Sequence, residues 1–355
     1  MSLETINIIK VFFPAVLAFV IGIIITPLFT HFFYHYKMWK KSSRSKDNSE
    51  GMAVDFHKIH NEDDELNTPR LGGMIIWVSA LITIALVYIA SKSFPTEQTI
   101  KMNFFSRNQT FIPLVTLVLA SLIGLSDDLL QIFGKGEYAK DKTTYRFIKI
   151  GALLAIGLFI GWWFYSKLGM SDVHIPFGGT LHLGILFIPF FIVIMLAVFS
   201  GSVIDGIDGL AGGVMGAIFI GYAAIAFGKD MFDLAAFSAM VGGGTLAFLW
   251  FNIPPARFYL GETGILGLTV TLATIAFLTD TVFLLPIIAL PLAATTFSDI
   301  VQIASRNLFG KRVFRLAPLH HHFEAIGWPK YKVTMRYWVV SIICVILAII
   351  IALVS

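Results

Sequence analysis

Two pairs of acidic residues stand where long apolar segments of the sequence end. Asp127 and Asp128 close one apolar segment, and Asp205 and Asp208 follow another, with Gly206 between them. Adjacent carboxylates repel each other unless a proton or a cation joins them, and glycine lets a ligand approach the backbone closely. Acids three residues apart share one face if the segment is helical. Both pairs indicate Mg²⁺ binding or phosphate chemistry, and the alternatives are a solvated helix end and a tight capping loop.

A third acidic position, Glu262, lies between two glycines directly ahead of another apolar segment. It follows Asn252 and the pair Pro254-Pro255, which must end the preceding helix. Clustered carboxylates suit a hard cation with oxygen ligands, so the sequence predicts Mg²⁺ rather than zinc. The alternative for Glu262 is a surface side chain in a turn.

The fourth candidate segment combines basic residues with three consecutive histidines. Lys311 and Arg312 precede His320, His321 and His322. Basic residues bind phosphate, and histidine can bind metal, transfer protons or donate to phosphate. Side chains alternate in direction along an extended segment, so the three histidines are not expected to hold one ion. Carboxylates, Mg²⁺ and basic groups together indicate phosphoryl or pyrophosphate chemistry, and the alternative is a solvated basic loop.

Lipid must be the solvent for most of the elements that position these residues. The 355 residues are 57% hydrophobic and 14% charged, whereas soluble domains carry about 25% charged residues. We predict an all-α, polytopic membrane protein that forms one domain over residues 1–355, with about ten spanning helices of roughly 20 residues each. The two spans around Thr271 and Ile288 are separated only by Asp280, and they could be a tight hairpin or one broken helix. The lone Cys344 excludes an internal disulfide and a thiolate metal cluster.

Most lysines and arginines fall in loops on one side of this topology. The positive-inside rule therefore places both termini outside the cytoplasm and all four candidate segments inside it. Residues 34–70 are predicted to be a mobile cytoplasmic loop, and residues 304–333 a cytoplasmic loop that carries the histidines and basic residues. Gly178-Gly179 predicts a small β-hairpin on the outer, periplasmic side.

These motifs resemble the polyprenyl-phosphate N-acetylhexosamine-1-phosphate transferase superfamily, and within it the phospho-N-acetylmuramoyl-pentapeptide transferase family. The resemblance extends from Thr68 to Trp338. Asp127-Asp128 and the stretch Asp205–Ala211 match motifs of the whole superfamily. The stretch Ala317–Glu324 is the most specific, and it favours the muramoyl branch over the branch that uses UDP-GlcNAc.

The resemblance implies ten spanning helices in the bacterial inner membrane, a cytoplasmic active site, Mg²⁺ and often a homodimer. The implied partners are UDP-N-acetylmuramoyl-pentapeptide, undecaprenyl phosphate and the bilayer, with no nucleic acid. Phospho-N-acetylmuramoyl-pentapeptide would move from UDP to undecaprenyl phosphate, and UMP would be released. Attack by the lipid phosphate could be direct or could pass through an aspartyl phosphate.

The resemblance also assigns roles by position. Asp127 or Asp128 would help to deprotonate the lipid phosphate, and Asp205 and Glu262 would serve the metal and the pyrophosphate. His320, His321 and His322 would contact the phosphate or the sugar of the donor. The residues implied in substrate binding are Asn252, Gly206, Ile207, Asp208, Arg70, Lys311 and Arg312.

The sequence departs from the family pattern at four places. Glu262 stands where Asp is usual, Ser202 where Asn is common, and Gln131 where a Lys often follows the paired Asp. The run of residues 62–65 is acidic where the family tends to be basic, and Arg70 could compensate. These departures leave open an inactive homologue that binds lipid or partner proteins. A transporter is a further alternative, because intramembrane carboxylates also mark ion pathways.

Overall fold

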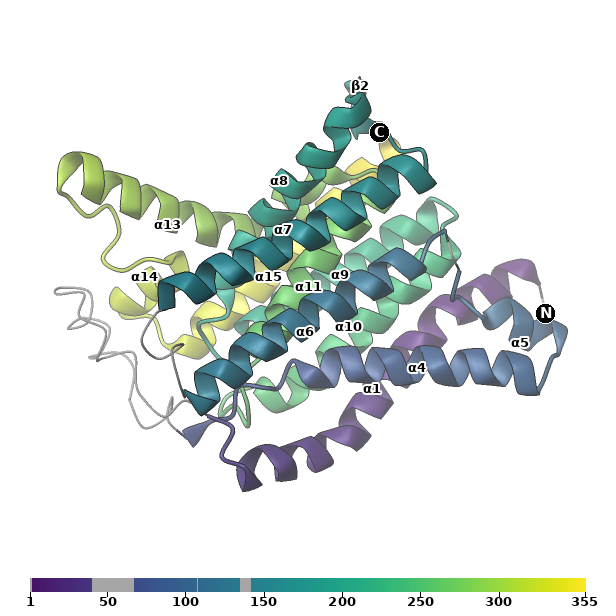
Figure 1. The fold of residues 1–355 in the computed structure, drawn as a ribbon, viewed down its shortest axis with the longest axis horizontal. Coiled ribbons are helices and arrows are strands. Elements are labelled where there is room, and N and C mark those ends of the chain that lie inside the picture. The colour runs from purple at the N-terminus through teal and green to yellow at the C-terminus, as the bar shows by residue number, and fades with distance from the viewer. Residues whose placement is uncertain (1, 40–66, 107, 135–141) are drawn as a thin grey trace.

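The computed structural model describes residues 2–39, 67–106, 108–134 and 142–355, with side chains from residue 147 onward in the last segment. Most of the predicted 34–70 loop, including the acidic run of residues 62–65, lies outside these residues. Within them, nine helices are long and apolar enough to span a membrane, which confirms the predicted all-α membrane fold (Figure 1). Eight of them are α1 (Leu3–His35), α4 (Met74–Ser93), α6 (Phe111–Phe133), α7 (Lys142–Lys167), α9 (Leu210–Gly228), α10 (Phe232–Asn252), α11 (Gly261–Leu278) and α15 (Lys330–Val354).

The ninth span combines α8 (Phe187–Ser200) with the 3-10 turns η3 (Gly184–Leu186) and η4 (Gly201–Ile204) that flank it. Two short helices, α5 (Glu97–Met102) and α14 (Leu319–Ala325), lie outside the spans.

The predicted span around Ile288, which brings the number of spans to ten, is present as a broken helix. A turn at residues 279–281 separates α11 from η5 (Val282–Leu284) and α12 (Leu285–Ile288). Helix α13 (Leu290–Phe309) then begins with Pro291 in its first turn, where proline is well tolerated. The chain bends by 84° at this break, and α13 leaves the bundle (Figure 1). The spans around Thr271 and Ile288 are therefore separate elements, and the second is the one that is broken.

Helix α11 forms the centre of the bundle, and almost all of its residues are buried. Small residues let its neighbours approach its backbone, as they do in other membrane helices. A Cβ built on Gly124 of α6 would lie 2.2 Å from the carbonyl oxygen of Glu262, and one built on Gly73 would lie 2.3 Å from Cα of Gly264. The backbones of α6 and α11 are therefore in direct contact where α11 begins.

The predicted hairpin is formed by β1 (Asp172–Ile175) and β2 (Gly179–His182), which pair antiparallel with Asp172 opposite His182. The N–H of His174 donates to Oδ1 of Asp280 at 2.9 Å, so the turn after α11 anchors the hairpin. The hairpin and both termini lie at the same end of the bundle (Figure 1). This placement agrees with termini on one side of the membrane, while the identity of that side stays a prediction.

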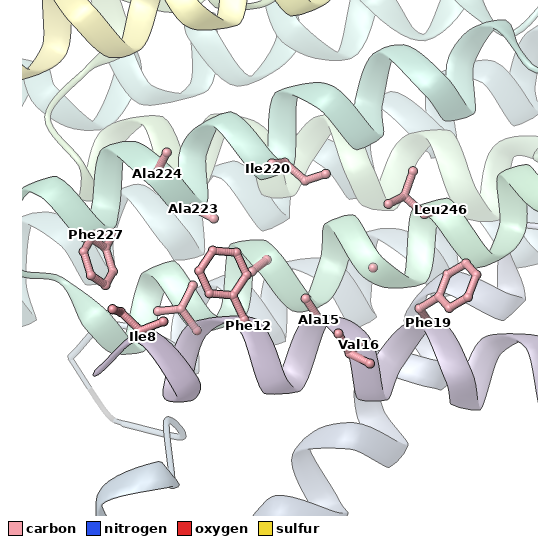
Figure 2. A pocket seen from close by; sticks show the side chains of 13 residues that line it. Ile8, Phe12, Ala15, Val16, Phe19, Ile220, Ala223, Ala224, Phe227 and Leu246 are labelled. Carbon is pink, nitrogen blue, oxygen red and sulfur yellow. The ribbon is translucent and has the colours of Figure 1, made fainter. Parts of the chain in front are cut away.

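An apolar cavity of about 590 Å³ lies between α1, α9 and α10 (Figure 2). Its lining includes Phe12, Phe19, Ile220, Phe227 and Leu246, and all of its described lining residues are apolar. It offers no group for the chemistry that the acidic motifs predict. The candidate site must therefore be sought where those motifs meet.

The contact between α6 and α11 can be tested with a single methyl group. Gly124→Ala forces α6 away from the carbonyl of Glu262, and we expect a loss of about 1–3 kcal/mol in unfolding free energy. Thermal unfolding of the purified protein in detergent measures this loss.

Gly151→Ala on α7 is the matched control, because a Cβ there meets no atom within 4 Å. We expect it to leave stability unchanged or to raise it by up to about 1 kcal/mol. Equal unfolding temperatures for the two variants would contradict the close contact.

Candidate active site

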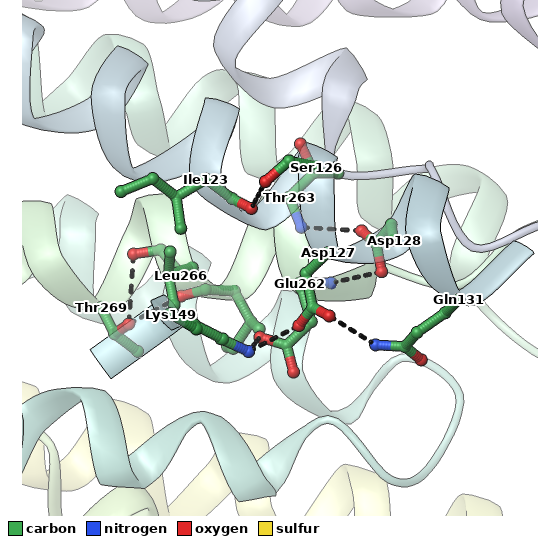
Figure 3. A network of polar contacts seen from close by, with 11 residues as sticks. Ile123, Ser126, Asp127, Asp128, Gln131, Lys149, Glu262, Thr263, Leu266 and Thr269 are labelled. Carbon is green, nitrogen blue, oxygen red and sulfur yellow. Dashed lines mark hydrogen bonds and ion pairs between the residues drawn. The ribbon is translucent and has the colours of Figure 1, made fainter. Parts of the chain in front are cut away.

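The carboxylate of Asp128 joins the end of α6 to the beginning of α11. Its Oδ1 accepts from the N–H of Glu262 at 3.1 Å and its Oδ2 accepts from the N–H of Thr263 at 2.8 Å (Figure 3). The first amides of a helix have no partner within the helix, and a negative charge there is favourable. Asp128 is fully buried, and it caps α11 by accepting from two of these amides.

Asp127, the neighbouring acid, belongs to a different set of contacts. Lys149 of α7 places its ammonium 2.7 Å from Oδ2 of Asp127 and 2.8 Å from Oε2 of Glu262 (Figure 3). Gln131 donates to Oδ1 of Asp127 at 3.2 Å. The lysine is largely buried, so it ties three helices together at one point. The sequence offered Lys149 only as one of many basic residues that set the topology, and its role in the site was missed.

Asp205 and Asp208 lie in a turn between η4 and α9, and not on one face of a helix. Gly209 adopts φ +75° at the end of this turn, a conformation that favours glycine. Burial raises the pKa of Asp205 to about 6; Arg70 opposes this, whereas the carboxylates of Glu262 and Asp208 add to it. The N–H of Gly261 also stabilises the ionised form of Asp205. The turn therefore lies beside the first residues of α11.

Arg70 is positioned by a short stretch of backbone pairing. The N–H of Tyr259 donates to the carbonyl of Pro69 at 2.8 Å, and the N–H of Gly72 donates back to the carbonyl of Tyr259 at 2.9 Å. Gly261 has φ +69°, and a Cβ there would lie 1.9 Å from the carbonyl of Arg70. The segment that carries Arg70 is thus pressed against the start of α11, where the guanidinium acts on Asp128 and Asp205.

Asn252 braces the backbone under the turn. Its Oδ1 accepts from the N–H of Gly209 at 2.8 Å, and its Nδ2 donates to the carbonyl of Phe258 at 2.9 Å. Asp208 accepts from the N–H of Ala256 at 3.3 Å. Ile207 is buried, as is Asn252. Of the predicted substrate-binding residues, these three therefore hold the shape of the turn.

The histidines lie on the short helix α14, whereas the sequence suggested an extended segment. The inner face of α13 holds the preceding residues: Oε1 of Gln302 accepts from the N–H groups of Val313 and Phe314. Ser298 accepts from the N–H of Leu319 at 2.8 Å, which fixes the start of α14. Neither Ser298 nor Gln302 belongs to a recognisable motif, so sequence analysis missed them.

His320 and His321 reach the turn that contains Asp205. A Cβ built on Gly206 would lie 2.5 Å from Nε2 of His320 and 3.0 Å from Nε2 of His321. A side chain at position 206 would have to displace the ring of His320 and press on that of His321, which glycine avoids. Two of the three predicted histidines are brought to the acidic cluster.

His322 contacts the segment that connects α13 to α14. Its Nδ1 accepts from the N–H of Arg315 at 3.2 Å. Burial and the guanidinium of Arg315 lower the pKa of His322 below its usual value. Lys311 and Arg312 are exposed between α13 and α14. His322, Lys311 and Arg312 therefore lie at the edge of the site, outside the buried cluster formed by the acidic residues, His320 and His321.

The residues fit a magnesium ion by their chemistry. In the described part of the chain, no group of three or more acidic, histidine or cysteine side chains surrounds a common point. Mg²⁺ in phosphate-handling sites is held by one or two carboxylates together with phosphate oxygens and waters. Asp205 and Glu262 could supply these carboxylates, because the turn that carries Asp205 lies beside the start of α11, where Glu262 stands. The nearby carboxylates outnumber Arg70 and Lys149 there.

The amino-acid sequence matches a family of known proteins. Residues 110–280 match the family model of glycosyl transferase family 4. The chain is 33% identical to the phospho-N-acetylmuramoyl-pentapeptide-transferase of Latilactobacillus sakei, over 91% of this chain and 94% of that protein. It is 33% identical to the protein of that name from Anoxybacillus flavithermus, over 96% and 97% of the two chains.

The chain belongs to the phospho-N-acetylmuramoyl-pentapeptide-transferase family. The resemblance expected from the motifs is thereby confirmed. The stretch 110–280 contains the paired Asp, the turn at Asp205 and Glu262, while α14 lies beyond it.

The different contacts of the paired Asp residues can be separated by mutation. Asp128→Ala leaves two N–H groups of α11 without their acceptor, and we expect a loss of about 1–3 kcal/mol for each that stays buried. Asp127→Ala is the matched control, because Lys149 keeps its contact with Glu262. Thermal unfolding should show the larger loss for Asp128→Ala, and the reverse order would refute the capping role.

Proposed function

We propose that this protein transfers phospho-N-acetylmuramoyl-pentapeptide from UDP to undecaprenyl phosphate and releases UMP. The family carries this proposal, since the relatives bear the name of that activity. The convergence of the four motifs supports it: Lys149 links Asp127 to Glu262, Asp205 lies beside Gly261, and Gly206 contacts the histidines. One end of the bundle thus gathers carboxylates, cations and imidazoles suited to a diphosphate.

In the proposed reaction, an oxygen of the lipid phosphate attacks the phosphorus that carries the sugar. The bond between that phosphorus and the oxygen of UMP breaks, and UMP leaves with the electron pair. Phosphoryl transfer of this kind depends on positioning and on stabilising the charge of the phosphate oxygens. The protein must therefore hold two phosphate groups in line against each other.

Asp127 and Lys149 are the residues we assign to the lipid phosphate. Asp127 is the better candidate to accept a proton from it, because its partners Lys149 and Gln131 are side chains, whereas both oxygens of Asp128 hold backbone amides of α11. The ammonium of Lys149 carries a charge that a phosphate oxygen can share. In the family pattern a lysine is often found where this sequence has Gln131. Lys149 could supply the missing positive charge, since both Lys149 and Gln131 contact Asp127.

Asp205 and Glu262 are the residues we assign to Mg²⁺. A bound Mg²⁺ would neutralise charge on the diphosphate oxygens and orient them. Arg70, His320 and His321 would bind the donor phosphates from the side of the turn. Lys311 and Arg312, exposed at the rim, would attract the anionic donor to the site.

We further propose that the protein lies in the bacterial inner membrane with this site on the cytoplasmic side. The charge distribution of the loops supports that orientation. The homodimer implied by the resemblance stays a prediction. No observation favours the UDP-GlcNAc relative, the transporter or the inactive homologue over the proposed activity.

The transferase activity can be tested by UMP release. Purified protein with UDP-N-acetylmuramoyl-pentapeptide, undecaprenyl phosphate and Mg²⁺ should release UMP. Asp205→Asn should slow release by about 100-fold or more, because it weakens the hold on the metal that would neutralise the diphosphate. A panel of other UDP-sugars serves as the control for donor choice. Wild-type release no faster than that of Asp205→Asn would sink the proposed activity.

Glu262 allows a second test of the metal assignment. Glu262→Asp keeps the charge and should retain activity, whereas Glu262→Ala should lose most of it and require more Mg²⁺ for the remainder. UMP release measured across a Mg²⁺ titration distinguishes these outcomes. Full activity of Glu262→Ala at low Mg²⁺ would rule out the metal role.

A further inference from the structure

A buried carboxylate contacts one of the two histidines that face the turn. Nδ1 of His321 lies 2.6 Å from Oε2 of Glu324. The side chains are 8% and 2% exposed, so both partners are removed from water. They are three residues apart on α14, a spacing that places side chains on the same face of a helix.

The pair fixes which nitrogen of His321 is presented to the site. When Glu324 is ionised its carboxylate can only accept, and Nδ1 of His321 then carries the proton that it donates to Glu324. The other nitrogen, Nε2, is the atom that lies against Gly206. Glu324 therefore sets the orientation of the ring, in the way that a carboxylate orients histidine in hydrolytic triads.

The charge of the pair suits an anionic ligand at the turn. A phosphate oxygen accepts hydrogen bonds, so Nε2 needs a proton to bind it. With protons on both nitrogens the ring is a cation, and a buried cation is stable only beside an opposite charge. Glu324 supplies that charge without occupying the face of His321 that points to Gly206.

We propose that Glu324 is a positioning residue, which holds His321 so that Nε2 donates to a diphosphate oxygen of the nucleotide-sugar donor. This inference rests on the proposed function for the identity of the donor, and it adds a residue to which that proposal gives no role. Glu324 acts through His321 and does not touch the substrate. Removal of its charge should weaken donor binding, while the lipid acceptor should bind as before.

Donor binding in the absence of lipid acceptor tests this inference without requiring turnover. Isothermal titration with UDP-N-acetylmuramoyl-pentapeptide should show about 10- to 100-fold weaker binding to Glu324→Gln, the effect of losing a hydrogen bond that involves a charged group. Glu97→Gln is the matched control, because it breaks an exposed ion pair with Lys101 on α5. It should bind the donor as the wild type does.

A double-mutant cycle shows whether Glu324 acts through His321. His321→Ala and the double variant His321→Ala/Glu324→Gln should bind the donor equally weakly. Wild-type affinity of Glu324→Gln, or a further loss in the double variant, would overturn the inference. If Glu324→Gln does not fold, Glu324→Asp replaces it in both measurements, because it keeps the charge but withdraws the oxygen by one methylene.

UMP release measured in parallel separates this inference from the proposed function. A wild-type protein that binds the donor but releases no UMP would refute the transferase activity, and the binding data would still decide the role of Glu324. Normal turnover by the wild type together with unchanged binding by Glu324→Gln would refute only the positioning role.

Discussion

The hydrogen bonds from the first amides of α11 to the carboxylate of Asp128 determine the rest of the site. Helix α11 is the most buried span of the bundle, and its N-terminus would carry unpaired N–H groups if α6 did not supply an acceptor there. Because Asp128 fixes that end, Glu262 is directed toward Lys149, and Gly261 is held beside Asp205. The cap and the site are thus built from adjacent residues of α6.

Electrostatics explains why so many charges can gather at one end of a membrane protein. Ionisable groups are expensive at membrane depth and are found where they pair or face a cavity. Lys149 is shared by two carboxylates, and Arg70 lies among the others. The remaining negative charge is a reason for the site to bind a cation. Burial is the main cause of the raised pKa of Asp205, and the neighbouring carboxylates of Glu262 and Asp208 add to it.

Hydropathy and charge were sufficient to predict the class of fold and most of its spans, because lipid imposes a length and a composition on each helix. The Gly178-Gly179 turn signal predicted the hairpin. Residue types were sufficient to single out Asp127, Asp205, Glu262 and the histidines as candidates, and the structure brings all of these except His322 to one end of the bundle core. Lys149, Ser298 and Gln302 could not be found in this way, since their roles depend on contacts between helices distant in sequence. The bend before α13 was also beyond prediction, because the apolar run continues through it.

The contact of Gly124 with the carbonyl of Glu262 limits how the site can be altered. Two helices that touch through their backbones cannot slide or spread without breaking many other contacts, because packed interiors leave few voids. The two helix backbones are therefore held at a fixed separation. The distance between a functional group and a ligand can then change only through the length of the side chain that carries the group. Glu262, at a position where the family pattern leads us to expect aspartate, would be an adjustment of that kind, and divergence within such a frame should favour changes of side-chain length over movements of helices.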